Sequence, residues 1–83
     1  METLIGKVTH YFPKIGVAVV YLIDDLKNGE QIRISGPNAN FRQLVTSMQI
    51  EHTTISSATK GQEIGMKVSQ PVHTGDVIYR ITA

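Results

Sequence analysis

The sequence contains no cysteine and no tryptophan, and only 6% of its 83 residues are aromatic. Without cysteine the chain can form neither disulfides nor thiolate zinc sites, and it has no cysteine nucleophile. Secreted domains of this size usually depend on disulfides, so we expect the protein in a reducing compartment, the cytoplasm.

Long apolar runs are also missing. The longest covers residues 15–23, which is too short to cross a bilayer as a helix. The first twelve residues hold no signal-peptide pattern. We therefore expect a soluble protein that does not insert into a membrane.

The chain has no strong excess of charge, since eight Lys and Arg against seven Asp and Glu leave a net charge of +1. Nucleic-acid-binding domains usually carry a basic surface and a high isoelectric point. Any contact with nucleic acid must therefore come from a local cluster of cations.

What the sequence does contain is β-strand signal along nearly its whole length. The length predicts a single domain over residues 1–83, and short apolar runs separated by Gly, Pro and Asn turns predict an all-β fold, a small closed antiparallel barrel of six or seven strands. The predicted core contains Val8, Ile32, Ile34, Ile64, Met66 and Val68. The predicted strands are residues 4–12, 15–23, 30–35, 41–52, 63–68 and 77–82.

Two of these strands have unusual patterns. Residues 15–23 are apolar on both faces, so the strand is covered on both sides or faces a partner. In residues 41–52 the apolar phase reverses, which we interpret as a β-bulge between Val45 and Met48. One unbroken strand, with Leu44 facing inward beside Met48, is the alternative.

A short sequence pattern recurs ahead of three predicted strands: a glycine followed by an acidic or amide residue. It occurs at Gly29-Glu30, Gly61-Gln62 and Gly75-Asp76. We interpret it as a turn in which glycine supplies the backbone conformation and the polar residue opens the next strand.

No catalytic motif is present. The three histidines, His10, His52 and His73, lack metal-ligand spacing, and no serine lies in a nucleophile elbow. Asp24 and Asp25 lie together on a loop, where they favour a turn over acid–base chemistry. His10 falls on the inward parity of its strand. We expect no enzyme, no metal and no cofactor.

Several segments resemble a known family: residues 5–12, 16–20, 26–32, 45–50, 58–66 and 75–79. They look like the β-barrel of translation factors, the second domain of elongation factor Tu. Residues 10–14 and 47–52 resemble a sub-group more closely: stand-alone elongation-factor-like proteins and the C-terminal barrel of collagenase-like, peptidase-type proteins of tRNA hydroxylation. The resemblance implies a non-enzymatic accessory module that contacts tRNA or translation-associated proteins. The chain contains no phosphate-binding loop of a GTPase, so the module has no nucleotide of its own.

Two surfaces are candidates for that contact. For RNA, cations would meet phosphates and aromatic rings would stack on unpaired bases; the alternative for the 10–14 segment is that Phe12 caps the core and Tyr11 covers an edge. For protein docking without RNA, the outward side chains of residues 15–23 would form the contact, unless the loops 24–30 or 53–61 cover them. The RNA candidates are Lys7, Tyr11, Lys14, Arg42 and His52, and the docking candidates are Val17, Val19 and Tyr21.

Overall fold

The structure is a computed structural model that describes residues 1–82, and these form ten strands and no helix. The all-β prediction is confirmed. The last residue of the predicted domain, 83, lies outside the described residues. The strands are β1 (Glu2–Phe12), β2 (Val17–Leu22), β3 (Leu26–Lys27), β4 (Gln31–Gly36), β5 (Ala39–Leu44), β6 (Met48–Ile50), β7 (Thr53–Ile55), β8 (Ser57–Ala58), β9 (Glu63–Lys67) and β10 (Val77–Ile81).

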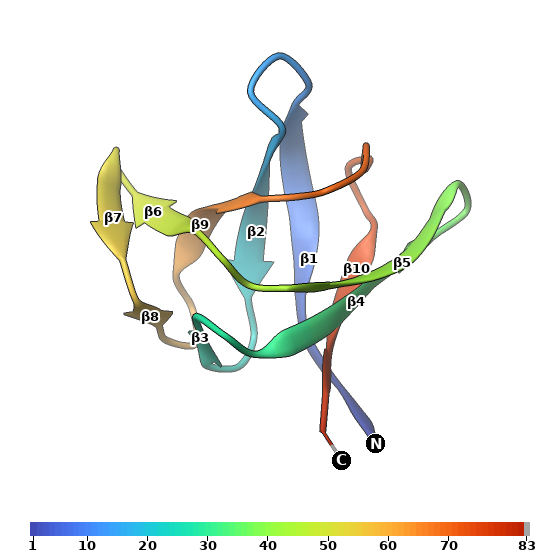
Figure 1. Cartoon of the computed structure of the whole chain (residues 1–83), viewed down its shortest axis with the longest axis horizontal. Coiled ribbons are helices and arrows are strands. Elements are labelled where there is room, and N and C mark those ends of the chain that lie inside the picture. Colours follow the sequence, from blue (N-terminus) through green and yellow to red (C-terminus); the bar gives the residue numbers. More distant parts are fainter. Residues whose placement is uncertain (83) are drawn as a thin grey trace.

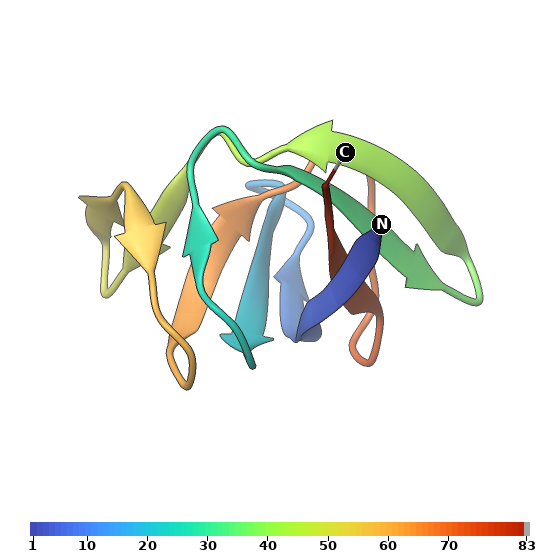
Figure 2. The ribbon, with the colours of Figure 1, turned by 90° about the horizontal axis from the view of Figure 1, so that it is seen from below.

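Eight strands form one strongly curved antiparallel sheet in the order β5-β4-β10-β1-β2-β9-β6-β7, and β3 pairs with β8 in a second, small sheet. The large sheet has β5 and β7 at its two ends and is not closed by strand pairing, so the closed six- or seven-stranded barrel is not confirmed. Figure 1 shows β5 and β7 on opposite sides of the molecule, and Figure 2 shows β4 and β5 arching over the hollow of the sheet.

Side-chain and loop hydrogen bonds take the place of a closing ladder. The Gln43 amide on β5 donates to the Lys67 carbonyl at 2.9 Å and accepts from the Ser69 N–H at 2.8 Å. The Val45 N–H, just beyond β5, donates to the Glu30 carbonyl. The two Gln43 bonds tie β5 to the end of β9 without a β-ladder between them, and the Val45 bond joins the end of β5 to the start of β4.

The core lies inside the curve of the sheet. All six residues predicted for it are buried, from Ile32, Ile34 and Met66 at 0% exposure to Val68 at 6%. Leu26 of β3 and Ala58 of β8 are buried as well, so the small sheet closes one end of the core.

Strand β1 departs from the predicted alternation because it contains two register shifts, between Leu4 and Gly6 and between Val8 and His10. Each shift changes which residues face inward. Tyr11 therefore packs against the core, whereas His10 and Phe12 are exposed, Phe12 by 44%. The expectations of an inward His10 and of Phe12 as a core cap are wrong.

The predicted strand 41–52 is two strands at distant places in the sheet. β5 pairs with β4, and β6 pairs with β9 and β7, with residues 45–47 crossing between them. Val45 is 1% exposed and Met48 is 0% exposed. The phase reversal read from the sequence is real, but its cause is a change of strand and not a bulge.

The prediction that a glycine turn precedes three of the strands is confirmed. Gly29, Gly61 and Gly75 have φ angles of 91°, 90° and 97°, as required at the third position of a type II turn. In each turn the polar residue after the glycine accepts a side-chain hydrogen bond from the N–H three residues earlier. The bonds are Lys27 to Glu30 (2.8 Å), Thr59 to Gln62 (2.8 Å) and His73 to Asp76 (2.9 Å).

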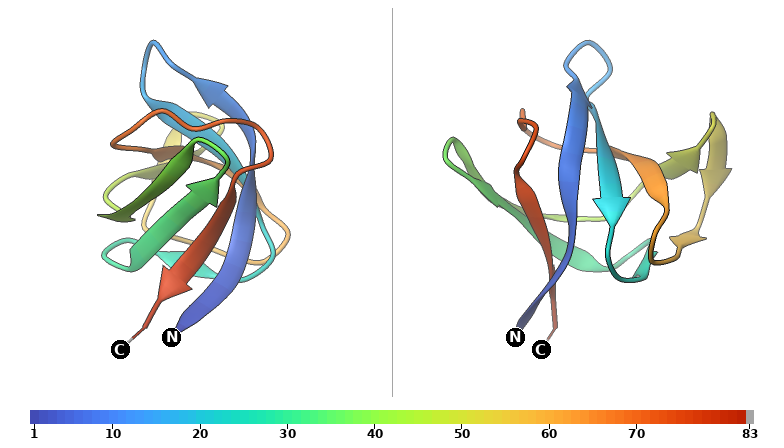
Figure 3. Two further views of the ribbon diagram at one scale, coloured as in Figure 1. Left: turned by 90° about the vertical axis from the view of Figure 1, so that its right-hand side faces the viewer. Right: turned by 180° about the vertical axis from the view of Figure 1, so that it is seen from behind.

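The hairpin that joins β1 to β2 projects beyond the rest of the sheet, as both views of Figure 3 show. The Gly16 N–H at its base donates to the Phe12 carbonyl at 3.0 Å. At the opposite end of β1, residues 1 and 82 exchange backbone hydrogen bonds, so the described ends of the chain lie side by side. The projecting hairpin carries Phe12 and Ile15.

Candidate functional site

The outward face of β2 is apolar and uncovered. Its inward residues, Ala18, Val20 and Leu22, are all 0% exposed, but Tyr21 on the other face is 42% exposed. Val17 and Val19 are half-buried. The loops 24–30 and 53–61 therefore leave this face open. We call the outward side chains of β1, β2 and their flanks the docking face: Leu4, Phe12, Ile15, Val17, Val19, Tyr21 and Ile23.

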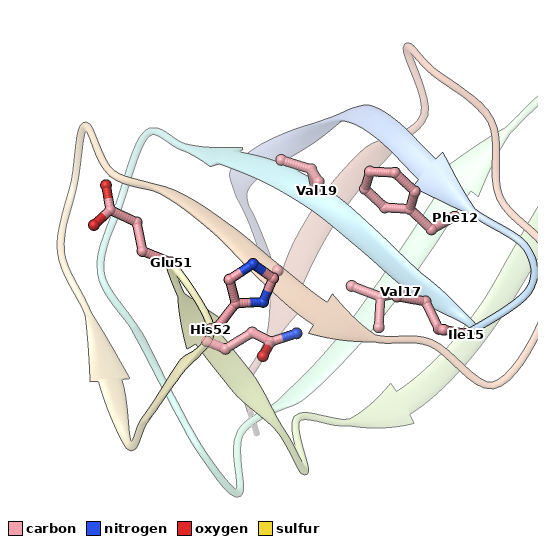
Figure 4. A pocket seen from close by; sticks show the side chains of 8 residues that line it. Phe12, Ile15, Val17, Val19, Glu51 and His52 are labelled. Carbon is pink, nitrogen blue, oxygen red and sulfur yellow. The ribbon is translucent and has the colours of Figure 1, made fainter.

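Part of the docking face forms one wall of a groove of about 350 Å³. We call it the hairpin groove. Figure 4 shows its apolar side chains on the β1–β2 side, with Glu51 and His52 of the β6–β7 turn across from them. Gly65 of β9 forms its floor, where a Cβ atom would come within 3.3 Å of Gln49 and 3.4 Å of Val17. The groove is lined by Phe12, Ile15, Val17, Val19, Gln49, Glu51, His52 and Gly65.

The β6–β7 turn holds its polar residues in an unusual backbone conformation. Glu51 has φ 48° and His52 has φ 66°, and Ile50 pairs with Thr53 around them. A two-residue turn with positive φ at both positions is normally built from Asn and Gly. For residues with a Cβ, the left-handed conformation costs roughly 1–2 kcal/mol each. Such strain collects at functional sites.

Glu51 differs from the other acidic residues in its bonding. The chain has seven Asp and Glu, and six of them accept hydrogen bonds from the protein. Within residues 1–82 the carboxylate of Glu51 accepts none, and the side chains of Gln49 and His52 make none either. The six bonded acids are Glu2 with Arg33, Asp24 with Arg80, Asp25 with Lys60 N–H, Glu30 with Lys27 N–H, Glu63 with Thr9, and Asp76 with His73 N–H.

Aromatic rings gather beside the hairpin groove. The rings of His10 and Phe12 lie 4.3 Å apart between centroids, tilted by 56°. His10 therefore supports the exposed Phe12 ring that lines the groove wall.

A second groove of about 300 Å³ continues the docking face. It is lined almost entirely by apolar atoms of Leu4, Tyr21, Ile23 and Val77, with Lys7 at its edge. Val19 of the hairpin groove and Tyr21 of this groove are two residues apart on the outward row of β2, and the Thr9 hydroxyl of β1 donates a hydrogen bond of 3.0 Å to the Glu63 carboxylate of β9 across that strand.

The outward surface of β10, β4 and β5 has a different character. Arg33 donates two hydrogen bonds of 2.8 Å to the carboxylate of Glu2 and one of 3.1 Å to Asn40. Its guanidinium carbon lies 4.8 Å from the centroid of the Tyr79 ring. We call these four residues the polar cluster. The hydrogen bond from Arg33 lowers the pKa of Glu2, and the carboxylate raises the pKa of Arg33.

The structure separates the residues predicted to bind RNA. Lys7 lies on β1 opposite Tyr21, Lys14 lies in the projecting turn, and Arg42 lies on β5 opposite Arg33. Strands β4 and β10 stand between Arg42 and Lys7, so the three cations do not share one rim.

Of the aromatic RNA candidates, His52 lines the hairpin groove and Tyr11 packs against the core. The docking candidates Val17 and Val19 line the same groove as His52, and Tyr21 lines the second one. The structure thus joins one RNA candidate to the predicted docking row.

The sequence placed Phe12 in the candidate segment 10–14 and Gln49 and Glu51 beside His52 in residues 48–52, but it did not single out these three or Ile15 as contact residues. The ambiguity of the adjacent pair Tyr11-Phe12 was the available signal for Phe12. Nothing marked Glu51 and His52 as a tight turn, because the pair is not the Asn-Gly or Asp-Gly sequence that is typical of such turns.

The acidic loop residues have structural roles. Asp24 accepts from its neighbour's N–H at 2.8 Å and pairs with Arg80 at 3.0 Å, and these bonds lower its pKa, the backbone bond most. In the part of the chain that the structure describes, no three His, Asp or Glu side chains are grouped so that they could hold a metal ion. Residues 1–82 also hold no helix able to cross a membrane.

No protein-family model matches the chain. It is 38% identical over 76 residues to an uncharacterized protease of Methanocaldococcus jannaschii, a stretch that is 90% of this chain and 19% of that protein. It is 36% identical over 81 residues to a collagenase of Porphyromonas gingivalis, 95% of this chain and 22% of the collagenase. The chain therefore spans about a fifth of the length of the curated relatives it matches.

Two solved structures share the fold. Both are of the C-terminal domain of a Geobacillus thermoleovorans protein classed as a U32 peptidase. One, a selenomethionine variant, has a TM-score of 0.87 at 24% identity and covers 92% of this chain and 96% of its own. The other has a TM-score of 0.88 at 23% identity, with 94% and 91% covered. The collagenase-like part of the resemblance is confirmed, and the chain has the fold of the C-terminal domain of a U32-peptidase-type protein.

Proposed function

We propose that this chain is a non-catalytic binding module that docks on a protein through its docking face. The observation that carries the proposal is the distribution of exposed apolar side chains. Of the seven large hydrophobic residues that are exposed, five line the two grooves: Leu4, Phe12, Ile15, Tyr21 and Ile23. A gathering of exposed apolar side chains around one strand is typical of an interaction site.

The relatives support an accessory role. In the protease and the collagenase, the matching stretch is about a fifth of a longer protein, and the related solved structures are of a C-terminal domain. A domain joined to a larger chain has a partner surface available at high effective concentration. The apolar face of this module suits such a surface.

RNA contact is a second candidate, favoured by the exposed rings of Phe12 and His52 in one groove. Aromatic rings on a sheet surface bind unpaired bases by stacking. The dispersed cations allow only about two or three phosphate contacts at once, so the binding would be weak and only shallowly dependent on salt. The link to tRNA and to the elongation-factor barrel stays a prediction.

Affinity capture from a cell lysate, with and without ribonuclease, separates the two functions. The wild-type chain is compared with Val19→Lys on the docking face and with Lys27→Glu on the small sheet as a surface control. Protein docking predicts a captured protein that resists ribonuclease and is lost with Val19→Lys alone, because an unpaired lysine is penalised at an apolar interface. Capture that survives Val19→Lys contradicts the proposal, and capture lost on ribonuclease treatment favours RNA.

A further inference from the structure

Resting on the proposed function, we infer that the hairpin groove binds an extended peptide segment that carries a basic side chain beside branched aliphatic ones. The groove has three chemically distinct parts: an apolar wall, an unpaired amide and an unpaired carboxylate. Each matches one part of such a segment.

The apolar wall accepts the aliphatic side chains. Phe12 and Ile15 are 44% and 59% exposed, and Val17 and Val19 continue the wall along β2. Because residue 65 is glycine, the side chains of Val17 and Gln49 lie close together over the floor, where a Cβ atom would come within 3.3 Å of Gln49 and 3.4 Å of Val17. Burying a valine side chain here removes apolar surface from water on both partners.

Gln49 offers a contact for a peptide backbone. Its side-chain amide makes no hydrogen bond within the described chain, although Gln43 and Gln62 each accept or donate in the fold. An amide both donates and accepts, so Gln49 can bond the carbonyl and the N–H of an extended chain.

Glu51 selects the charge of the ligand. Among residues 1–82 it is the acidic residue whose carboxylate accepts no hydrogen bond, and a strained turn holds it at the groove. A carboxylate attracts a lysine or arginine and repels phosphate, which favours a basic peptide over RNA. Lys67 faces outward beside Val17 at the far end of the wall, so the basic side chain belongs at the Glu51 end.

The test uses the whole chain with isotope-labelled methyl groups and a blocked six-residue peptide that contains one lysine, two valines and otherwise glycine and serine. We expect saturable shifts at the methyl groups of Ile15, Val17 and Val19. Replacing the peptide lysine by glutamate, or both valines by serine, should remove the shifts.

Protein variants locate the charge contact. Glu51→Gln should weaken the peptide by about threefold to fivefold, the upper range for an exposed ion pair, and Phe12→Ala by about tenfold. Glu63→Gln is the matched control: it removes the same charge from the same face, but its carboxylate already accepts from Thr9. It should change the affinity by less than about twofold.

Three outcomes overturn the inference. They are equal binding of the lysine and glutamate peptides, tighter binding of a short oligouridylate at the same methyl groups, and shifts that grow with protein concentration alone, which would make a second copy the occupant. If the peptide fails while Val19→Lys still abolishes protein capture, the docking function stands and only the assigned ligand is wrong.

Discussion

The outward surface of the large sheet has two halves that differ in whether their side chains find partners within the fold. Over β10, β4 and β5, the polar cluster bonds Arg33 to Glu2, Asn40 and Tyr79. Around β2, mostly apolar side chains line two grooves, and Gln49, Glu51 and His52 at one of them make no side-chain hydrogen bond within residues 1–82. The residues of the polar cluster have their partners within the fold. The second half exposes apolar surface that folding leaves in water, which is the property of a surface that binds a partner.

The inward and outward side chains of the paired strands β2 and β9 should differ most in their effect on stability. Ile64 on β9 pairs with Val20, and both are buried, whereas Val19 on the next position faces the groove. Ile64→Ala should cost about 2–5 kcal/mol of unfolding free energy, a large share of the stability of a domain this small. Val19→Lys should cost about 0.5 kcal/mol or less.

Urea unfolding followed by circular dichroism measures both changes. If Val19→Lys unfolds the protein, β2 is core on both faces and the docking function is lost with it. If Ile64→Ala is tolerated, Ile64 is not buried in solution.

The same kind of glycine turn precedes a strand in each half, so replacing the glycine should lower the stability by a similar amount in both. Gly61 precedes β9 in the apolar half and Gly75 precedes β10 in the polar half, and neither has an atom within 4 Å of an added Cβ. The cost of alanine is therefore backbone strain alone, about 1–2 kcal/mol at each site. Equal losses in thermal unfolding would show that the halves differ in surface and not in construction, and a neutral Gly61→Ala would contradict the turn geometry.

The β6–β7 turn should trade stability for binding. Replacing Glu51-His52 by Asn-Gly supplies residues that suit positive φ at both positions, and we expect a gain of about 1 kcal/mol in unfolding free energy. The same change removes the carboxylate and the imidazole from the hairpin groove, so peptide binding should fall. A variant that is no more stable than the wild type would mean that the turn is not strained.

The inward side of the molecule was largely predictable from the sequence because burial leaves a period of two in the strands. Ile32, Ile34, Ile64, Met66 and Val68 follow that period and are buried. The glycine turns were also predictable. Each turn requires a positive φ, which glycine adopts readily, so a glycine followed by a polar residue marks the turn in the sequence.

The outward site was less predictable, for two physical reasons. The register shifts in β1 reverse the facing of Phe12 and Tyr11, and no residue type marks a shift of this kind. The segment 41–52 reads as one strand because a strand pattern does not show which neighbour each part pairs with. Glu51 and His52 thus looked like a solvated strand end, and only the fold places them across from Phe12.

The smallest expected effect belongs to the polar cluster and concerns pH. Arg33 holds the pKa of Glu2 below its ordinary value of about 4.5, chiefly through the hydrogen bonds between them. The unfolded chain lacks this contact and binds its proton first as the pH falls, so the pair stabilises the fold above the ordinary pKa. That contribution disappears as the pH falls through the lowered value. The pair is exposed to solvent, so the effect should be small and should decrease with salt.

Glu2→Gln should therefore lower the stability slightly at neutral pH, and its difference from the wild type should disappear as the pH falls from about 5 through the lowered pKa, which flattens the acid side of the stability curve. Arg33→Gln should flatten the same region and also removes the contacts with Asn40 and Tyr79, so the double variant should add little to Arg33→Gln alone. Urea unfolding across pH 3–7 at low and high salt gives the three curves. Additive effects of the two substitutions would show that Glu2 and Arg33 act separately. The side chains of the polar cluster would then be no better paired than those around the grooves.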